Sequence, residues 1–240
     1  LLEIYVRERE WHRAVKVATE LERISGIPFR KEIAQYYCEM AVKSILDQDL
    51  HTARHELEMA LDANKNCVRA NIMLGEMEAN NKAHKMAIGF WKRIEFQNPA
   101  FLGIVAHKLL NSYRELGQLE EGVNLLKQYA QTYKLPSLMA VVFEITLTEE
   151  GADSAARMAI DELERKPSLQ TLDQLLKARG LQAEPNTDNG LMQQTVRYAI
   201  GNRSAYCCEQ CGFKARNFHW QCPACNAWEA LPAELKETTL

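Results

Sequence analysis

The segment AVKSILDQDLHTARHELEMA, residues 41–60, decides the fold. It carries small side chains at Ala41, Ala53 and Ala60, and Leu57 completes an apolar stripe at positions i, i+4 and i+7 from Ala53. That spacing puts the apolar residues on one face of a helix. Tyr37 and Ala41 belong to a second apolar pattern just upstream. The segment therefore predicts two consecutive helices that pack together.

The same stripe recurs along the chain at a nearly fixed period. The small residues that begin it are separated by 34, 35 and 34 residues at Ala53, Ala87, Gly122 and Ala156. Further apolar residues follow each of them four and seven positions later, namely Leu57 and Ala60, Trp91 and Ile94, Leu126 and Tyr129, and Ile160 and Leu163. An earlier copy, with Ala14, Ala18 and Leu21, is offset by 39 residues because Gly26-Ile27-Pro28 lengthens the junction. A fixed period favours stacked repeats over a general helical bundle.

This pattern resembles the tetratricopeptide repeat, a 34-residue helix-turn-helix unit with small residues at its eighth, twentieth and twenty-seventh positions. Ala41, Ala53 and Ala60 match all three, and Gly75 and Ala87 match two in the next unit, where Gly75 would let two helices approach closely. The resemblance implies an all-α helical solenoid. In that frame the first helix of each unit lines a concave surface, and the candidate partner-binding residues there are Gln35, Arg69, Glu76, His107, Asn111 and Arg114. Solvated helix faces are the alternative interpretation of these six residues.

Regular spacing fades after Pro167, and we interpret the rest of the chain as a cap and a separate small module. We expect a helix around 169–179, a polar loop at 184–190, a helix near 191–201 and a short linker at 202–205. The predicted organisation is repeats over 1–170 (the first one partial), capping helices over 171–202, a metal module over 203–230 and a tail over 231–240. The repeat frame starts the chain inside a helix, so we expect earlier repeats to precede it in the natural protein.

Two C-x-x-C pairs, ten residues apart, predict the metal site. A two-residue spacer lets a tight turn aim both sulfurs at one point, and two such turns complete a tetrahedral shell of four thiolates. The expected ligands of one zinc or iron ion are Cys208, Cys211, Cys222 and Cys225; spacing does not separate the two metals. Disulfides are the alternative, but the total of seven cysteines is odd. Cys38 and Cys67 are expected to be buried packing residues.

Composition excludes several classes of function. The 240 residues carry a formal net charge of -3 without a basic stripe, which argues against nucleic-acid binding. The longest apolar run, residues 138–147, contains Glu144 and is expected to be a core helix. No phosphate loop, nucleophile elbow or H-E-x-x-H motif is present, and His51 and His55 fit a solvated helix face. We therefore expect a soluble chain that is not an enzyme. The odd number of cysteines, with Cys38 and Cys67 far in sequence from the two C-x-x-C pairs, suits a reducing compartment, so we expect the chain to be cytoplasmic.

Several stretches together resemble the lipopolysaccharide assembly protein B family of Gram-negative bacteria. They are YCCEQCGF at 206–213, WQCPAC at 220–225, LEIYVREREWHRAVKVATEL at 2–21, IAQYYCEMA at 33–41 and the Asn64-Lys65-Asn66 turn. The resemblance implies a rubredoxin-like C-terminal module whose ligands are the same four cysteines; Cys207 is extra and has no assigned role. Family members also begin with a membrane-spanning helix, which is absent from this chain. That helix would place the protein on the cytoplasmic face of the inner membrane.

The function implied by the resemblance is that of an adaptor that restrains lipid A synthesis. In the family it helps the membrane protease FtsH to degrade the deacetylase LpxC, so both proteins, and other lipopolysaccharide-assembly proteins, are expected partners. The alternative is a rubredoxin-type electron carrier built on a helical-repeat scaffold. Only ten residues separate the two cysteine pairs, which leaves little chain to shield a redox metal. The sequence does not give the oligomeric state, and a homodimer stays open.

Overall fold

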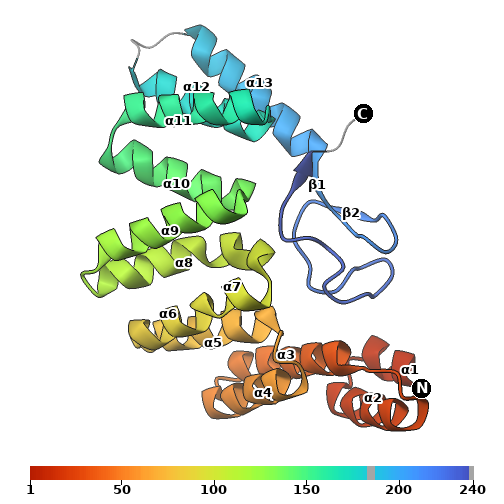
Figure 1. Ribbon diagram of the computed structural model, residues 1–240. Helices are drawn as coiled ribbons and strands as arrows, with labels where there is room; N and C mark the ends of the chain where they lie inside the picture. Colours follow the sequence, from red (N-terminus) through yellow and green to blue (C-terminus); the bar gives the residue numbers. More distant parts are fainter. Residues whose placement is uncertain (183–186, 238–240) are drawn as a thin grey trace. The chain divides into compact units, whose positions relative to one another are not determined.

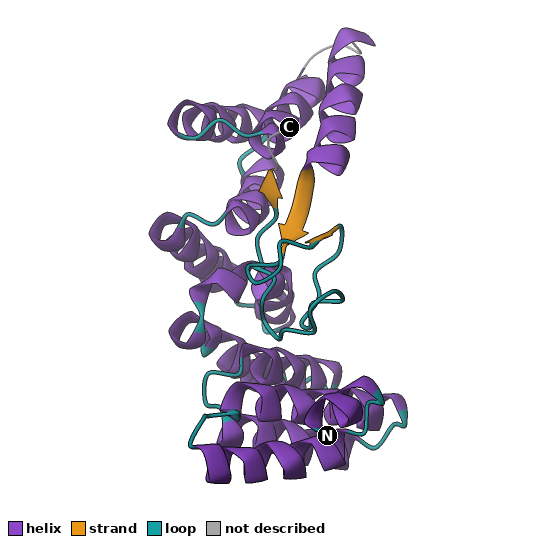
Figure 2. Cartoon of the chain, turned by 90° about the vertical axis from the view of Figure 1, so that its right-hand side faces the viewer, coloured by secondary structure: helices purple, strands orange, loops and turns teal. Residues whose placement is uncertain are grey.

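The computed structural model describes residues 1–182 and 187–237 and is built almost entirely of helices, with short strands near the C-terminus (Figure 2). The chain forms two compact units, Leu1–Gly117 and Gln118–Leu240. Helices that follow one another along the chain pack as pairs within each unit (Figure 1). The predicted all-α fold of tetratricopeptide-like helix pairs with a small C-terminal module is confirmed.

The first unit contains the helix pairs of the early repeats. Its elements are α1 (Leu2–Arg7), α2 (Trp11–Ser25), α3 (Arg30–Leu46), α4 (Leu50–Ala63), α5 (Val68–Asn80), α6 (His84–Lys92), α7 (Ile94–Gln97), the 3-10 helix η1 (Pro99–Phe101) and α8 (Leu102–Glu115). Residues in the turns between these helices cap the helix ends. Asp49, for example, precedes α4 and accepts a hydrogen bond from the Thr52 N–H at 3.0 Å, which satisfies one free amide of the first turn.

The predicted small residues lie where the paired helices touch. Ala41, Ala53 and Ala60 have no exposed surface. Ala41 and Ala60 pack with Leu57 and Leu74 in the core between α3, α4 and α5. Close approach of helix axes leaves no room for larger side chains at such positions. The sequence pattern therefore identified the interior correctly.

Gly75 shows the close approach most clearly. A Cβ added to this residue would overlap the indole ring of Trp91 on α6. The ring is itself buried, and its Nε1–H donates to the carbonyl oxygen of Ile72 at 3.2 Å. The predicted role of Gly75, to let two helices approach, is confirmed.

The second unit continues the helix pairs and ends in the small sheet. Its elements are α9 (Leu119–Tyr133), α10 (Pro136–Glu149), α11 (Ala152–Arg165), α12 (Leu169–Gln182), α13 (Thr187–Arg203), β1 (Ser204–Cys207), β2 (Lys214–Ala215) and β3 (Lys236–Glu237). The strand order is β2-β1-β3 with both pairings antiparallel. Leu126 and Tyr129 of the repeated stripe are buried, whereas Ile160 and Leu163 are half-buried on α11.

Two expectations near the junction with the metal module are wrong. Helix α13 already begins at Thr187, so the part of the expected loop at 187–190 is helical, while 183–186 lie outside the described residues. Asp188 in its first turn suits the positive end of the helix dipole. The expected linker at 202–205 is absent because α13 runs to Arg203 and β1 starts at Ser204, where the backbone pairs with β3.

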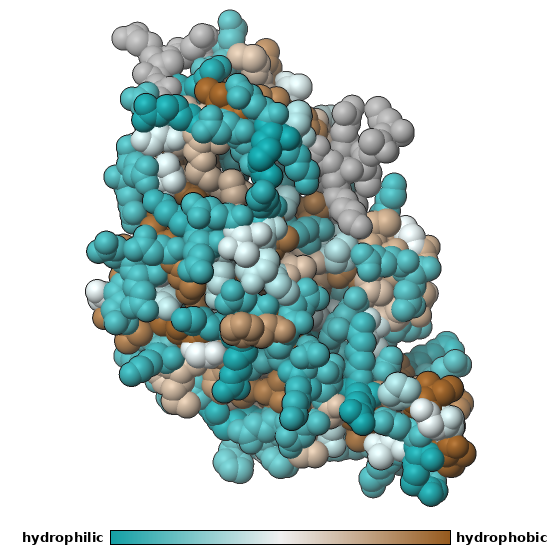
Figure 3. All heavy atoms as spheres, in the orientation of Figure 1, coloured by the Kyte–Doolittle hydropathy of each residue, from teal (hydrophilic) through white to brown (hydrophobic). Residues whose placement is uncertain are grey.

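Among residues 1–182 and 187–237, every helix is too short or too polar to cross a bilayer. The face of the molecule in Figure 3 is mostly hydrophilic, with hydrophobic residues in separate small groups. Scattered apolar residues of this kind are normal on a protein surface.

Candidate metal centre

The two C-x-x-C segments fold into turns with the same backbone hydrogen bonds. In the first turn the Cys208 N–H donates to the Phe213 carbonyl at 2.8 Å, and the Gly212 N–H donates to the Cys208 carbonyl at 2.9 Å. In the second, the Cys222 N–H donates to the Ala227 carbonyl at 2.8 Å, and the Asn226 N–H donates to the Cys222 carbonyl at 2.9 Å. The module is therefore a duplicated turn whose halves meet at the cysteines.

Both turns close with a residue in the left-handed conformation. Gly212 has φ 74° and Asn226 has φ 59°, and each directly follows the second cysteine of its pair. Glycine adopts this conformation without strain, and asparagine tolerates it better than most residues. Asn226 holds the same position after its cysteine pair as Gly212 does, so the sequence carries a signal for both turns.

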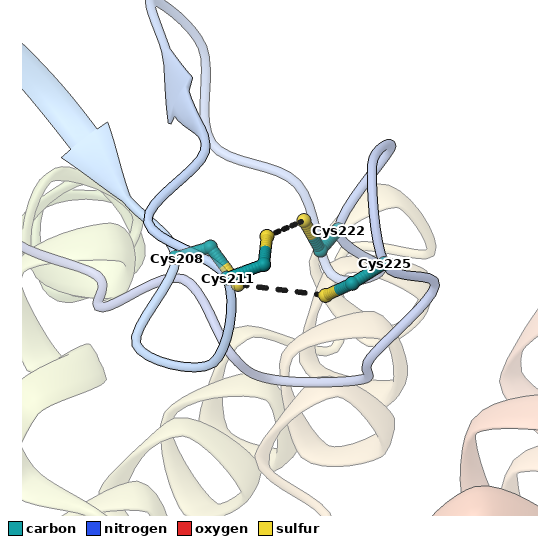
Figure 4. A group of neighbouring side chains, drawn as sticks. All are labelled: Cys208, Cys211, Cys222 and Cys225. Carbon is teal, nitrogen blue, oxygen red and sulfur yellow. Dashed lines mark hydrogen bonds between the residues drawn. The ribbon is translucent and has the colours of Figure 1, made fainter.

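The four cysteine sulfurs converge on one point between the turns (Figure 4). All four Sγ atoms lie within 4.8 Å of one another, and the Cys208–Cys225 and Cys211–Cys222 sulfur pairs are each 3.7 Å apart. Four sulfurs at about 2.3 Å from a tetrahedral metal would be separated by about 3.8 Å. All seven cysteines are free thiols, so the disulfide alternative is not adopted. The residues present thus fit a four-thiolate metal site.

Each pair contributes one buried and one exposed cysteine. Cys208 and Cys222 are buried, whereas Cys211 and Cys225 are exposed. The site therefore has a protein side, formed by the core of the module, and a solvent side. A complete four-thiolate shell still leaves no coordination position for a substrate, which is the arrangement of structural metal sites.

Electrostatics inside the cluster favour a bound cation. The Cys211 N–H donates to the Cys208 sulfur and, with the Gln210 N–H, lowers the pKa of Cys208 to about 7. The Phe213 N–H also acts to lower the pKa of Cys211, but desolvation by nearby protein atoms and the three neighbouring thiols outweigh it and raise this pKa to about 12. Four thiolates at this separation repel one another unless a positive ion lies between them.

The core beside the site is small. It consists of the buried residues Cys208, Ala215, Cys222, Ala230 and Leu231, with Tyr206, Phe218 and Ala227 packed against them. Two edge-on ring contacts lie within the module, Tyr206–Phe218 at 5.8 Å and Phe218–Trp220 at 5.0 Å between ring centroids. So few apolar residues cannot stabilise a fold alone, and a bound metal would supply the missing stability.

A short tail joins the module to the helix pairs of the same unit. The Glu209 N–H donates to the Ala230 carbonyl at 2.8 Å, which holds the start of the tail against the first turn. Four residues later, the Glu234 carboxylate accepts hydrogen bonds from the Ser137 hydroxyl and from the Ser137 N–H, the latter at 3.1 Å. Ser137 is in the first turn of α10, where a negative charge is favourable. This anchor was missed because its two ends are 97 residues apart in sequence.

Cys207 stands outside the cluster. It is the last residue of β1, paired with Lys214 of β2, and its Sγ lies 3.7 Å from the Gly212 carbonyl oxygen. The side chain is half-buried. Cys207 thus lies beside the first turn without joining the four converging sulfurs.

Two of the predicted partner-binding residues are buried, which corrects their assignment to an open surface. Gln35 is 0% exposed and Arg69 is 7% exposed. The Arg69 guanidinium donates to Gln35 Oε1 at 3.3 Å and forms a salt bridge with Glu39 at 2.8 Å, so these residues join α3 to α5. Cys38 and Cys67 are buried beside them, as predicted, with their sulfurs 3.7 Å apart.

The other four candidates are available to solvent. His107, Asn111 and Arg114 are exposed on α8 at helical spacing, and Arg114 donates to Asn111 Oδ1 at 2.8 Å. Glu76 on α5 is partly exposed and pairs with Lys108 of α8. His51 and His55 are exposed on α4, in agreement with the expected solvated face.

Comparisons with known proteins give the module a family. Residues 206–232 match a family model described as "Rubredoxin metal binding domain". This match covers both cysteine pairs, the aromatic cluster and the buried Leu231. Together with the converging sulfurs, it establishes a metal-binding module of zinc-ribbon type; the identity of the ion is a separate question.

The whole chain is similar to curated proteins named "Lipopolysaccharide assembly protein B". Identity is 26% over 234 residues with the protein of Escherichia coli (strain K12), covering 96% of this chain and 60% of the relative. The protein of Haemophilus influenzae gives 26% identity, with 96% and 59% covered. The chain thus spans about 60% of the length of these relatives. A solved structure titled "Functional Characterization of Pseudomonas Aeruginosa pilF" is similar with a TM-score of 0.47 and 11% identity, covering 84% of this chain and 87% of that one.

Proposed function

We propose that this protein is a non-enzymatic adaptor that regulates lipopolysaccharide synthesis. Its partners would be the deacetylase LpxC and the membrane protease FtsH, and its task would be to promote degradation of LpxC at the cytoplasmic face of the inner membrane. The observation that carries the proposal is the similarity to lipopolysaccharide assembly protein B over 96% of the chain. The name of those relatives supports a role in lipopolysaccharide assembly. The two partners are those that the family resemblance implies.

The architecture supports binding rather than catalysis. Stacked helix pairs offer extended surfaces for proteins and peptides. In this chain the row His107, Asn111 and Arg114 on α8 presents an imidazole, an amide and a guanidinium cation to solvent at helical spacing. We propose that this row, with Glu76, contacts a partner.

The metal would act as a brace in this adaptor. Cys208, Cys211, Cys222 and Cys225 would hold one zinc or iron ion, which supplies charge compensation and cross-links the two turns. The turns hold Ala230, and the tail after it reaches Ser137 on α10 through Glu234. Loss of the ion would therefore release an anchor on the helix pairs without removing any partner contact directly.

The test is degradation of LpxC by FtsH reconstituted in lipid vesicles, with and without this chain tethered to the same vesicles. We expect the tethered chain to accelerate LpxC loss, and Arg114→Glu and Cys222→Ser to reduce the acceleration. Arg179→Glu, an exposed change on α12, is the matched charge control and should have no effect. If titration detects no binding to LpxC or FtsH and degradation is unchanged when residues 203–240 are removed, the adaptor function is wrong.

One observation favours a second function, electron transfer. Cys211 and Cys225 are exposed, so a redox partner would have access to the metal through the sulfur atoms. This function requires iron, because zinc is not redox-active. Protein loaded only with zinc should support the adaptor assay fully; failure of the zinc form alongside normal activity of the iron form would favour the electron carrier.

A further inference from the structure

A cavity in the first unit lies outside every site described so far. Its volume is about 440 Å³. The cavity is lined by the end of α4, by the turn that joins α4 to α5, by the start of α5, and by α7 together with Arg93, which directly precedes α7. Sites for small ligands and short segments commonly have volumes of about 300–1,000 Å³. Neither the metal centre nor the exposed row on α8 contributes a residue to it.

Two buried oxygen atoms that line this cavity have no hydrogen-bond partner. Asn71 on α5 is 1% exposed, and its Oδ1 is unpaired. Gln97 on α7 donates through Nε2 to the Lys65 carbonyl at 2.6 Å, which fixes the orientation of its amide, yet its buried Oε1 is also unpaired. Buried acceptors are nearly always paired with protein groups or with ordered water, so two in one cavity mark positions where the donors of a ligand can replace water.

The rim of the cavity restricts the chemistry of that ligand. Phe96 is 85% exposed, which provides an apolar surface next to the two acceptors. The lining of the cavity contains two exposed cations, Lys65 and Arg93, and one carboxylate, that of Asp62. Within the described ranges none of the three forms a salt bridge. A cationic donor would be repelled, whereas a neutral N–H donor with an acidic group nearby would fit.

We propose that this cavity binds an extended, acidic segment of a partner protein. Backbone N–H groups of the segment donate to Asn71 Oδ1 and Gln97 Oε1, an apolar side chain packs on Phe96, and acidic side chains lie beside Lys65 and Arg93. The segment must be extended, since the N–H groups within a helix are already paired. The inference deepens the proposed adaptor function and rests on it, because it specifies the chemistry of the partner segment.

The binding test uses synthetic peptides on the intact chain. The probe is acetyl-Glu-Leu-Glu-Leu-Glu-amide, compared with its lysine counterpart and with a version whose backbone nitrogens are methylated. We expect only the first peptide to shift the side-chain amide NMR signals of Asn71 and Gln97 saturably. Absence of a shift, or an equal response to the methylated or lysine peptide, would overturn the proposal.

A substitution at Asn71 separates binding from folding. Asn71→Leu removes the unpaired acceptor and keeps the number and branching of the side-chain heavy atoms, so we expect an unchanged or higher Tm together with about tenfold weaker peptide binding. A merely structural amide would instead give a lower Tm. Retained affinity in Asn71→Leu would overturn the proposal whatever its Tm.

Charge reversal on the rim provides a second variant that should not disturb folding. Arg93→Glu should weaken binding of the acidic peptide about tenfold, whereas Lys92→Glu on the neighbouring exposed residue should not. Equal effects of the two would contradict a site at this cavity. Because these assays contain neither LpxC nor FtsH, peptide binding here with no LpxC binding would reject the proposed function and leave the cavity site intact.

Discussion

The helix pairs and the metal module are stabilised by different means. Between α3, α4 and α5 a continuous apolar core forms around Ala41, Leu57 and Leu74, and the same stripe recurs in later repeats. In the described part of the module few residues are buried: the core cluster is Cys208, Ala215, Cys222, Ala230 and Leu231, and Trp228 is buried as well. Two of these residues are cysteines of the metal site. Apolar burial grows with the size of a fold, so the repeats can rely on it and the module cannot. We therefore expect loss of the metal to unfold the module, and disruption of helix packing to destabilise the repeats.

The largest effect is expected from breaking the metal shell. Cys222→Ser should abolish binding of one metal equivalent and unfold the module, since structural zinc sites contribute about 10–16 kcal/mol of apparent binding energy. Helical circular dichroism should fall little, because the repeats do not depend on the ion. Metal content and the NMR spectrum of residues 206–232 are the measurements.

The neighbouring thiol provides the control for that experiment. Cys207 is adjacent in sequence but lies outside the converging sulfurs, so Cys207→Ser should keep full metal content. Equal metal loss in Cys207→Ser and Cys222→Ser would show that the ligand set is wrong.

A smaller effect is expected from overfilling the helix interface. In Gly75→Ala the new methyl group would overlap the Trp91 ring, and overpacking of this kind costs about 1–3 kcal/mol. Gly89 on α6 is helical too, but nothing lies within 4 Å of its added Cβ, so Gly89→Ala should stabilise the chain by up to about 1 kcal/mol. Chemical denaturation measures both, and a shared sign would contradict the interface described here.

Weakening the anchor between the two regions should have a modest effect. Glu234→Gln keeps an acceptor for Ser137 but removes the negative charge at the start of α10, at a cost of about 0.3–1 kcal/mol. Glu149→Gln at the opposite end of the same helix removes an unfavourable charge and should be neutral or slightly stabilising. Thermal unfolding at low salt compares the two, and a larger loss in Glu149→Gln would be inconsistent with the anchor.

The smallest predicted effect concerns pH and lies within the repeats. The Thr52 hydroxyl, at 2.6 Å, and the Thr52 N–H hold the pKa of Asp49 below its usual value. A lowered pKa in the folded state means that ionised Asp49 stabilises the fold above the unfolded pKa of about 3.9, and this stabilisation is lost as the pH falls through the folded pKa.

Replacement of Asp49 by asparagine tests this pH dependence. Asp49→Asn still caps α4 but does not titrate, so between about pH 5 and about pH 3 its Tm should fall less than that of the unsubstituted chain. Glu58→Gln, at an exposed carboxylate in the same helix, should follow the unsubstituted chain. Parallel acid profiles of Asp49→Asn and the unsubstituted chain would show that the cap does not titrate as described.

Sequence reasoning succeeded where a local pattern determines the structure. Period and small residues located the buried faces of the repeats, and cysteine spacing located the converging sulfurs, because both follow from the geometry of one short segment. It failed where the outcome depends on residues distant in sequence. Gln35 and Arg69 are buried because their helices lie side by side, and the burial of Asn71 likewise depends on packing. The strand at Ser204 exists because β3 pairs with it.

X-ray absorption at the metal edge of the purified chain distinguishes a four-thiolate centre from any other arrangement of these cysteines. We predict one zinc or iron ion per chain with four sulfur neighbours at about 2.3 Å. We also predict the same coordination in Cys207→Ser. Nitrogen or oxygen atoms in the first coordination shell, or a chain that folds the module fully after chelation without any metal, would contradict the four-thiolate centre.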